Sequence, residues 1–190
     1  MPIKPVIAII GDANIDEHED KRAFAEEMGK RIIDSGFRLQ TGGMGGVMEA
    51  AGKGARSSGR WQDGDIISII PGFDPAEAHQ YSDIVIPTGL GHARNMLVVQ
   101  ADAVVAIGGG PGTLSEMAFA WNYSRLIVAK RGSGCAGKLA DTSLDERRKR
   151  YEDIPNDRVY GADSPEEAME LLLTLMPLYQ KRTSCTPKRV

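Results

Sequence analysis

The stretch Val104-Val-Ala-Ile-Gly-Gly-Gly-Pro-Gly-Thr-Leu-Ser-Glu116 decides the fold. A continuous apolar run, typical of a strand covered on both faces, leads into a loop with four glycines in five positions and then directly into a helical pattern. Glycine lacks a β-carbon, so the backbone can approach a ligand closely, and free N–H groups at a helix start favour an anion such as phosphate. A tight turn is the structural alternative, but a turn alone seldom needs four glycines. We therefore expect Gly108–Thr113 to hold the phosphate of a nucleotide-like ligand.

Short apolar runs alternate with helical patterns along the rest of the chain. The expected strands are Val6–Ile10, Phe37–Thr41, Ile66–Ile70, Ile84–Ile86, Ala103–Ile107 and Leu126–Ala129. The expected helices lie near Asp20–Ser35, Val47–Ser57, His92–Gln100 and Gly112–Tyr123. This alternation predicts an α/β fold with a Rossmann-like, doubly wound parallel sheet and right-handed crossovers.

The C-terminal part predicts one more strand and one more helix. The stretch Arg131–Pro155 is glycine-rich at first and then highly charged, which indicates a mobile excursion with room for one surface helix. A strand is expected at Arg158–Gly161 and a helix at Ser164–Lys181. The N-cap, first-turn proline and capping-box acid of this helix would be Ser164, Pro165 and Glu167.

The composition bounds the class of protein. The chain has 190 residues, 42% hydrophobic and 26% charged, which is enough for one sizeable core and short for two ordinary domains. We expect one domain over residues 1–182 and a disordered tail at 183–190. The formal net charge of -3 provides no basic excess for binding nucleic acid. There is no signal-peptide pattern or membrane span, and the only cysteines are Cys135 and Cys185, so we expect a cytoplasmic protein.

A second glycine-rich loop repeats the pattern of the first. Thr41-Gly-Gly-Met-Gly-Gly46 lies between a predicted strand and a predicted helix, and two shorter loops follow other strands. Parallel strands place such loops at one edge of the sheet, at the switch point where doubly wound folds bind ligands. The expected phosphate- and nucleotide-binding residues are Gly11, Asp12, Thr41, Gly42, Gly43, Met44, Gly45, Gly46, Pro71, Gly72, Gly108, Gly109, Gly110, Gly112 and Thr113.

Two charged residues lie near these loops. Arg94, within Gly91-His-Ala-Arg-Asn-Met96, opens the helix before the Ala103–Ile107 strand, and a guanidinium there suits a phosphate or a sugar hydroxyl. A surface arginine or a salt bridge to a helix is an equally good interpretation. Glu116 also has a structural alternative, because Thr113-x-x-Glu116 matches a capping box. Thr113 could cap the helix or donate its hydroxyl to the anion.

Other motifs favour no further site. Gly132-Ser-Gly-Cys-Ala-Gly-Lys138 matches G-x-G-x-x-G and nearly matches a P-loop, but Leu139 stands where the Mg²⁺-binding Ser or Thr belongs. We expect a flexible loop there. The histidines lack the spacing of metal ligands, so no metal site is expected at His18, His79 or His92.

Gly109-Gly-Pro-Gly-Thr-Leu-Ser-Glu116 resembles the G-G-x-G-T-x-x-E motif of the Lonely Guy (LOG) superfamily, whose members are often mislabelled as lysine decarboxylases. Thr41–Glu49 and Gly91–Met96 match in order and spacing. The resemblance runs over about Val6 to Leu175 and points to the branch of the molybdenum-cofactor carrier proteins, which also carries the G-L-G-x-A-R-N segment seen at Gly89–Asn95. It implies a Rossmann-like homo-oligomer, dimeric as in LOG enzymes or tetrameric as in the carriers, with phosphate on the Gly109–Thr113 loop.

The resemblance also implies a catalytic pair. LOG enzymes cleave the base from nucleoside 5′-monophosphates with an Arg and the terminal Glu of the motif, which match Arg94 and Glu116. Such a carboxylate can stabilise an oxocarbenium-like transition state and orient water, while the arginine holds the ribose or phosphate. The chain departs from the plant-type pattern at Asn95, where Lys commonly follows the Arg, and at Ser115, where a first Glu commonly precedes the second. Nothing suggests a pyridoxal phosphate site with its Schiff-base lysine.

Two functions follow from these observations. The first is a binding protein for a small phosphorylated ligand, either the molybdenum cofactor or a nucleoside monophosphate, with no cofactor required for chemistry. The alternative is a nucleoside 5′-monophosphate phosphoribohydrolase that uses Arg94 and Glu116. A nucleotide sensor or a DNA-uptake protein is a weaker candidate, because the acidic balance argues against DNA.

Overall fold

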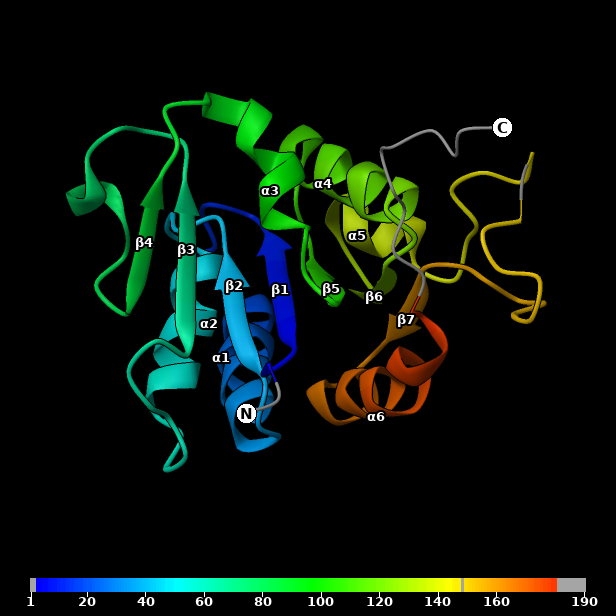
Figure 1. The fold of residues 1–190 in the computed structure, drawn as a ribbon, viewed down its shortest axis with the longest axis horizontal. Helices are drawn as coiled ribbons and strands as arrows, with labels where there is room; N and C mark the ends of the chain where they lie inside the picture. Colours follow the sequence, from blue (N-terminus) through cyan, green and yellow to red (C-terminus); the bar gives the residue numbers. More distant parts are fainter. Residues whose placement is uncertain (1–2, 148, 181–190) are drawn as a thin grey trace.

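The centre of the sheet brings together two strands that are far apart in sequence. In this computed structural model, which describes residues 3–147 and 149–180, β1 (Val6–Gly11) pairs in parallel with β5 (Ala103–Ile107). One side of this pair continues with β2 (Arg38–Thr41), β3 (Ile66–Ile70) and β4 (Ile84–Pro87), and the other with β6 (Leu126–Lys130) and β7 (Tyr160–Ala162). All seven strands are parallel, in the order β4-β3-β2-β1-β5-β6-β7 (Figure 1). The predicted doubly wound Rossmann-like α/β fold is confirmed.

Helices cover both faces of the sheet (Figure 1). One layer consists of α1 (Glu19–Asp34), α2 (Val47–Arg56) and α6 (Pro165–Leu175), and the other of α3 (Asn95–Val98), α4 (Pro111–Asn122) and α5 (Gly134–Leu139). Successive β1 residues point to opposite faces, so Ile7 and Ile9 belong to one core cluster and Ala8 and Ile10 to the other. The central strands are apolar throughout because both faces are buried.

Glycines bring α1 and α2 into backbone contact. A β-carbon on Gly29 would lie 2.0 Å from the Ala51 carbonyl oxygen, and one on Gly54 would lie 1.7 Å from the Glu26 carbonyl oxygen. Neither position has room for a side chain. This contact holds α2, and therefore the end of the glycine-rich loop that precedes it, against α1.

The segment before β5 is less regular than predicted. In place of a helix over His92–Gln100, a 3₁₀ turn at Gly91–Arg94 precedes the short α3. Gly89 and Gly91 have φ of +63° and +54°, so the chain enters this segment through left-handed turns. Two other 3₁₀ turns are found at Pro75–Glu77 and Met176–Leu178.

The predicted cap of the last helix is confirmed. The Ser164 hydroxyl accepts a hydrogen bond from the Glu167 amide at 3.2 Å, and the Glu167 carboxylate accepts one from the Asp163 amide at 2.7 Å. The helix ends at Leu175, earlier than expected, because Pro177 lacks the N–H that would continue it. Residue 181 and the predicted disordered tail lie outside the described residues.

The described part of the stretch Arg131–Pro155 contacts the core through α5 and Arg150, and the mobility expected of this excursion stays a prediction. It contains α5, as the room for one helix allowed, and Arg150 stacks over Trp121 with its guanidinium carbon 3.5 Å from the ring centroid. Arg150 also pairs with Asp157 at 2.6 Å. Both side chains are nearly buried, and the Asp157 carboxylate offsets the cost of burying the Arg150 charge.

Candidate functional site

The loops after β1 and β5 meet where the strand order changes direction. The chain builds β2, β3 and β4 on one side of β1 and then crosses to β5 on the other side. Gly11 pairs with Ile107, so the loops after β1 and β5 leave the sheet side by side. No side chain fits at Gly11, where a β-carbon would lie 2.2 Å from the Ile107 carbonyl oxygen. Doubly wound sheets bind their ligands between two such diverging crossovers.

A cleft of about 390 Å³ opens at this edge of the sheet. The predicted site residues in its wall are Gly11, Asp12, Met44, Pro71, Arg94, Gly110, Gly112, Thr113 and Glu116. The wall also contains residues that were not predicted, namely Ala13, Met48, Gly91, His92, Asn95 and Pro111. These lie within or directly beside the predicted motifs, so a wider reading of each motif would have found them.

The other predicted glycines form the framework behind the cleft. Gly109 has φ of +86°, and a β-carbon there would lie 2.1 Å from the Thr113 hydroxyl. A β-carbon on Gly43, with φ of +76°, would lie 2.3 Å from the Ile70 side chain. The predicted residues that are not in the cleft wall are Thr41, Gly42, Gly43, Gly45, Gly46, Gly72, Gly108 and Gly109. Of these, Gly45 and Gly46 line a neighbouring polar cavity of about 440 Å³ that shares Ala13 with the cleft.

Lys21 is a buried cation beneath the first loop that the sequence did not single out. It is 6% exposed, and its Nζ lies 2.7 Å from Asp12 Oδ2. A β-carbon on Gly108 would lie 2.2 Å from that oxygen and 2.9 Å from the ammonium. A buried ammonium needs a partner. The pairing offsets the negative charge of Asp12 beside the predicted phosphate-binding loop.

Gly132–Lys138 supports the same loop from outside. The expectation of a flexible loop is wrong, because this stretch runs into α5 and Ala136 is fully buried. The Cys135 amide donates to the Gly109 carbonyl at 2.8 Å, and the Ala136 amide donates to the Gly108 carbonyl at 2.9 Å. The glycine motif in this segment therefore makes a structural contact with the first loop.

Arg94 and Glu116 are buried together in the cleft wall, each 7% exposed. Burial raises the pKa of the Glu116 carboxyl to about 7, and the Arg94 charge offsets part of this effect. Burial lowers the pKa of the Arg94 guanidinium, while the charge of Glu116 raises it. The guanidinium remains charged at neutral pH.

Arg94 is held from behind by backbone and side-chain acceptors. Its Nη2 donates to the Gly42 carbonyl at 3.2 Å and its Nη1 donates to Asn95 Oδ1. Its Nε is buried and has no hydrogen-bond partner among the described residues. The interpretation of Arg94 as a surface arginine is therefore wrong, and the structure brings it to the predicted place near the start of α4.

The capping-box interpretation of Glu116 is also wrong. Helix α4 begins at Pro111 with Gly110 as its N-cap, and no side chain caps it. Thr113 is therefore inside the first turn and does not occupy the N-cap position. Within the described part of the chain, burial and the Arg94 charge act on the Glu116 carboxyl, and no hydrogen bond to it is found. A buried carboxyl in this condition is available to a ligand.

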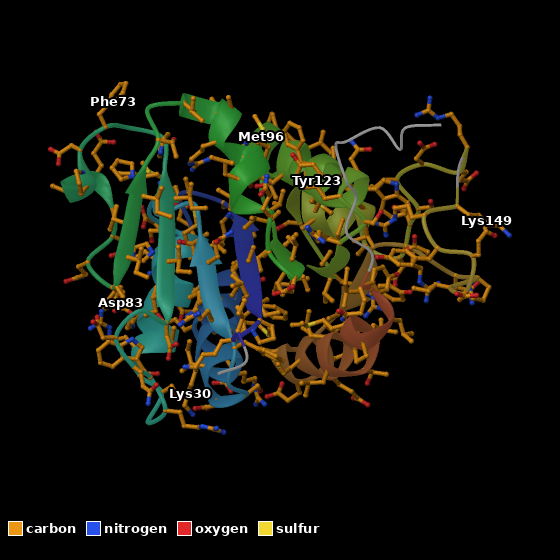
Figure 2. The ribbon with its side chains drawn as sticks, viewed as in Figure 1. Lys30, Phe73, Asp83, Met96, Tyr123 and Lys149 are labelled. Carbon is orange, nitrogen blue, oxygen red and sulfur yellow. The ribbon has the colours of Figure 1, made fainter. Side chains whose placement is uncertain are left out.

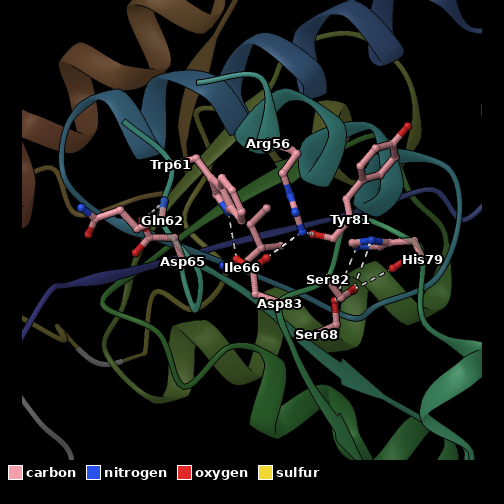
Figure 3. A network of polar contacts seen from close by, with 10 residues as sticks. All are labelled: Arg56, Trp61, Gln62, Asp65, Ile66, Ser68, His79, Tyr81, Ser82 and Asp83. Carbon is pink, nitrogen blue, oxygen red and sulfur yellow. Dashed lines mark hydrogen bonds and ion pairs between the residues drawn. The ribbon is translucent and has the colours of Figure 1, made fainter. Parts of the chain in front are cut away.

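A cluster of hydroxyl groups around His79 supports the second glycine loop, and Figure 3 shows Ser68 and Ser82 beside the imidazole. The His79 amide donates to the Gly43 carbonyl at 2.9 Å, and the imidazole lies 3.2 Å from the Ser82 hydroxyl and 3.4 Å from the Thr41 hydroxyl. Ser68 and Ser82 share a hydrogen bond of 2.7 Å. Burial lowers the pKa of His79 to about 4, so the imidazole is neutral at neutral pH.

Neither a metal cluster nor a membrane span is found in residues 3–147 and 149–180. No group of at least three His, Cys, Asp or Glu side chains in these ranges could hold a metal ion. Their helices are too short or too polar to cross a membrane.

Comparison with known proteins identifies the family. Residues 4–169 match the model of the SLOG cluster4 family. The molybdenum cofactor binding protein from the phototrophic bacterium Rippkaea orientalis has a TM-score of 0.75 and 31% identity, covering 92% of this chain and 98% of that chain. For the molybdenum cofactor carrier protein from Chlamydomonas reinhardtii, the TM-score is 0.72 and the identity 31%, covering 92% and 99%.

The chain is also more distantly similar in sequence to an enzyme. A cytokinin riboside 5′-monophosphate phosphoribohydrolase from Mycobacterium tuberculosis is 29% identical over 106 residues, which span 55% of this chain and 56% of that protein. The resemblance to LOG-like proteins and to the molybdenum cofactor carriers is confirmed by these matches. The chain belongs to the SLOG cluster4 family of LOG-like proteins.

Proposed function

We propose that this protein binds a phosphate-bearing, nucleotide-like ligand in the cleft and carries it, with the molybdenum cofactor as the leading candidate. The observation that carries this proposal is the open space at Gly110 and Gly112. Both line the cleft, and a β-carbon on either residue would have no protein atom within 4 Å. Packing of the protein does not require glycine at these two positions, whereas it does at Gly108 and Gly109. Room for a ligand explains them.

The surroundings of this space suit an anion. The first amides of α4, a helix of 12 residues, have no partner within the helix and lie at its positive end. Arg94 adds a buried charge to the same wall. A terminal phosphate of the cofactor would be held by the Gly110–Thr113 backbone and by Arg94, and the cofactor would supply its own redox chemistry to an acceptor protein.

Isothermal titration with inorganic phosphate, adenosine monophosphate and the isolated cofactor tests this proposal. We expect heat of binding with the wild type, and a loss of binding with Gly110→Ala, because the methyl group would enter the space that the ligand needs. Gly59→Ala is the matched control, since a β-carbon there also meets no protein atom within 4 Å but the residue does not line the cleft. Absence of heat with all three compounds would exclude the carrier function.

A second candidate, nucleoside 5′-monophosphate phosphoribohydrolase, is favoured by one specific observation. Glu116 combines burial beside Arg94, the absence of a hydrogen bond, and a pKa raised to about 7. Such a carboxyl can stabilise an oxocarbenium-like transition state in its ionised form or give a proton in its neutral form. Incubation with adenosine monophosphate should release adenine, and Glu116→Ala should abolish the release. If the wild type releases none while still binding the nucleotide, only the carrier function stands.

We also propose that the protein is a homo-oligomer, either a dimer or a tetramer. The edge strand β4 exposes Ile84 and Ile86, each at 44%, and Phe73 is 84% exposed in the neighbouring loop. Figure 2 shows Phe73 projecting outward at this end of the molecule. Apolar exposure of this kind is typical of surfaces that a second copy covers. Native mass spectrometry of freshly purified protein would report the number of subunits and any retained ligand together.

A further inference from the structure

The side chain of Asn95 connects Arg94 to the beginning of α4. It is 2% exposed, and its Oδ1 accepts a hydrogen bond from Arg94 Nη1. Its Nδ2 donates to the Ser115 hydroxyl at 2.8 Å and to the Gly112 carbonyl at 3.3 Å. The Ser115 hydroxyl in turn donates to the Gly112 carbonyl at 2.7 Å. The two positions at which the chain departs from the plant-type motif are therefore in direct contact.

The groups at the two ends of this hydrogen-bonded series, the Arg94 guanidinium and the Gly112 carbonyl, determine the direction of each hydrogen bond in it. The Gly112 carbonyl can only accept, so the Ser115 proton points to it and leaves the hydroxyl oxygen as an acceptor. The NH₂ group of Asn95 must therefore face Ser115. At the other end the guanidinium can only donate, so the carbonyl oxygen of Asn95 faces Arg94. Both requirements agree on one orientation of the amide.

We propose that Asn95 is a positioning residue, oriented by Ser115, that sets the direction of the Arg94 guanidinium relative to the Gly110–Thr113 loop. Its contribution to ligand binding rests on the proposed function, in which Arg94 contacts the anion. Apart from the Asn95 contact, the guanidinium has one hydrogen bond, to the Gly42 carbonyl, and its Nε has none within the described chain. Loss of Asn95 or of its orientation would leave Arg94 with a single anchor.

The proposal depends on Asn95 and Ser115 both being uncharged. Asn95 and Ser115 orient Arg94 without cancelling its charge. A carboxylate at position 95 would make a charge-assisted pair with the guanidinium and compete with an anionic ligand. Asn95→Asp should therefore bind inorganic phosphate more weakly than the wild type, although it keeps an acceptor for Arg94.

A double-mutant cycle distinguishes positioning from general support. We expect Ser115→Ala to weaken the binding of adenosine monophosphate about fivefold in the wild type, and less than about twofold when Arg94→Ala is already present. An equal loss in both backgrounds would show that Ser115 does not act through Arg94. The matched control is Ser57→Ala, because Ser57 also donates to a carbonyl three residues earlier, at 2.7 Å, but at the C-terminal end of α2.

NMR spectra recorded without ligand test directly whether Asn95 positions the Arg94 guanidinium. In the unliganded wild type, the guanidinium N–H signals of Arg94 in NMR spectra should exchange slowly with water. Asn95→Leu and Ser115→Ala should each speed this exchange, and Ser57→Ala should not. Unchanged Arg94 signals in both of the first two variants would overturn the proposal. Failure of the wild type to bind phosphate or adenosine monophosphate would count against the proposed function, while the exchange rates would still test the role of Asn95.

Discussion

Two buried polar clusters lie beside the glycine loops, and they differ in how completely their groups are paired. His79 and Glu116 are almost equally buried, at 8% and 7% exposed, and burial favours the neutral form of each. The imidazole of His79 is surrounded by hydroxyl groups of the protein, whereas the Glu116 carboxyl has no hydrogen-bond partner in the described chain. Burial of a titratable group therefore does not indicate a ligand site. A buried group in a cleft wall that lacks a partner is a better candidate for contact with a ligand.

The largest expected effect is on the pH dependence of stability at Glu116. The pKa is about 7 in the folded protein against 4.5 ordinarily, so the folded state holds the proton more tightly. The resulting stability is fully present below the ordinary pKa and is lost as the pH rises through about 7. Relative to Glu116→Gln, the wild type should lose about 3 kcal/mol of unfolding free energy across this range.

Urea unfolding at a series of pH values measures this loss. Glu17→Gln, a substitution of an exposed acid, is the control and should follow the wild type. A constant difference between wild type and Glu116→Gln across the range would contradict the raised pKa.

The contribution of His79 to stability should depend on pH in the opposite direction. Its pKa is about 4 in the folded protein against 6.5 ordinarily, so the unfolded state binds the proton more tightly. The stability that it contributes is complete above the ordinary pKa and is lost as the pH falls through about 4. Relative to His79→Gln, the wild type should lose about 3 kcal/mol in acid.

The pH ranges of the two effects overlap and their signs are opposite. The unfolding free energy of the wild type should therefore change little with pH, and each single variant should make the change steeper. Thermal or urea unfolding of the two single variants and of the double variant checks this. Two single variants with slopes of the same sign would break the comparison.

A smaller effect is expected when Arg94 is removed and ligand affinity is measured. Arg94→Ala removes the buried charge from the cleft wall and should weaken the binding of adenosine monophosphate by about 2 kcal/mol, or roughly thirtyfold. Arg147→Ala is the control, because this arginine is exposed and outside the cleft wall. Isothermal titration gives both affinities, and equal values for the two variants would remove Arg94 from the site.

The smallest effect is expected in the paired cluster. Ser82→Ala deletes a hydroxyl that contacts both Ser68 and His79 and should lower the unfolding free energy by about 1 kcal/mol. The affinity for adenosine monophosphate should stay within about twofold of the wild type, because the cluster lies behind the loop. A large loss of affinity would show that this cluster also belongs to the ligand site.

The fold and the general place of the candidate cleft could be predicted from the sequence for a simple reason. A strand buried on both faces is apolar at every position, and a loop that must turn sharply into a helix is rich in glycine, so both are visible in neighbouring residues. The stretch around Gly108–Thr113 contains both features, and the alternation of strands with helices predicts parallel strands with right-handed crossovers. The strand order itself is seen only in the folded chain.

The individual role of each glycine was decided by the tertiary structure. Gly108 is next to Asp12 and Lys21, which come from the N-terminal part of the chain, whereas Gly110, two residues later, has open space beside it. The burial of Arg94 and its link through Asn95 to Ser115 also depend on the packing of α3 against α4. The space around a β-carbon, and the partner of a buried charge, depend on residues that are distant in sequence, so only the folded chain determines which groups are left for a ligand.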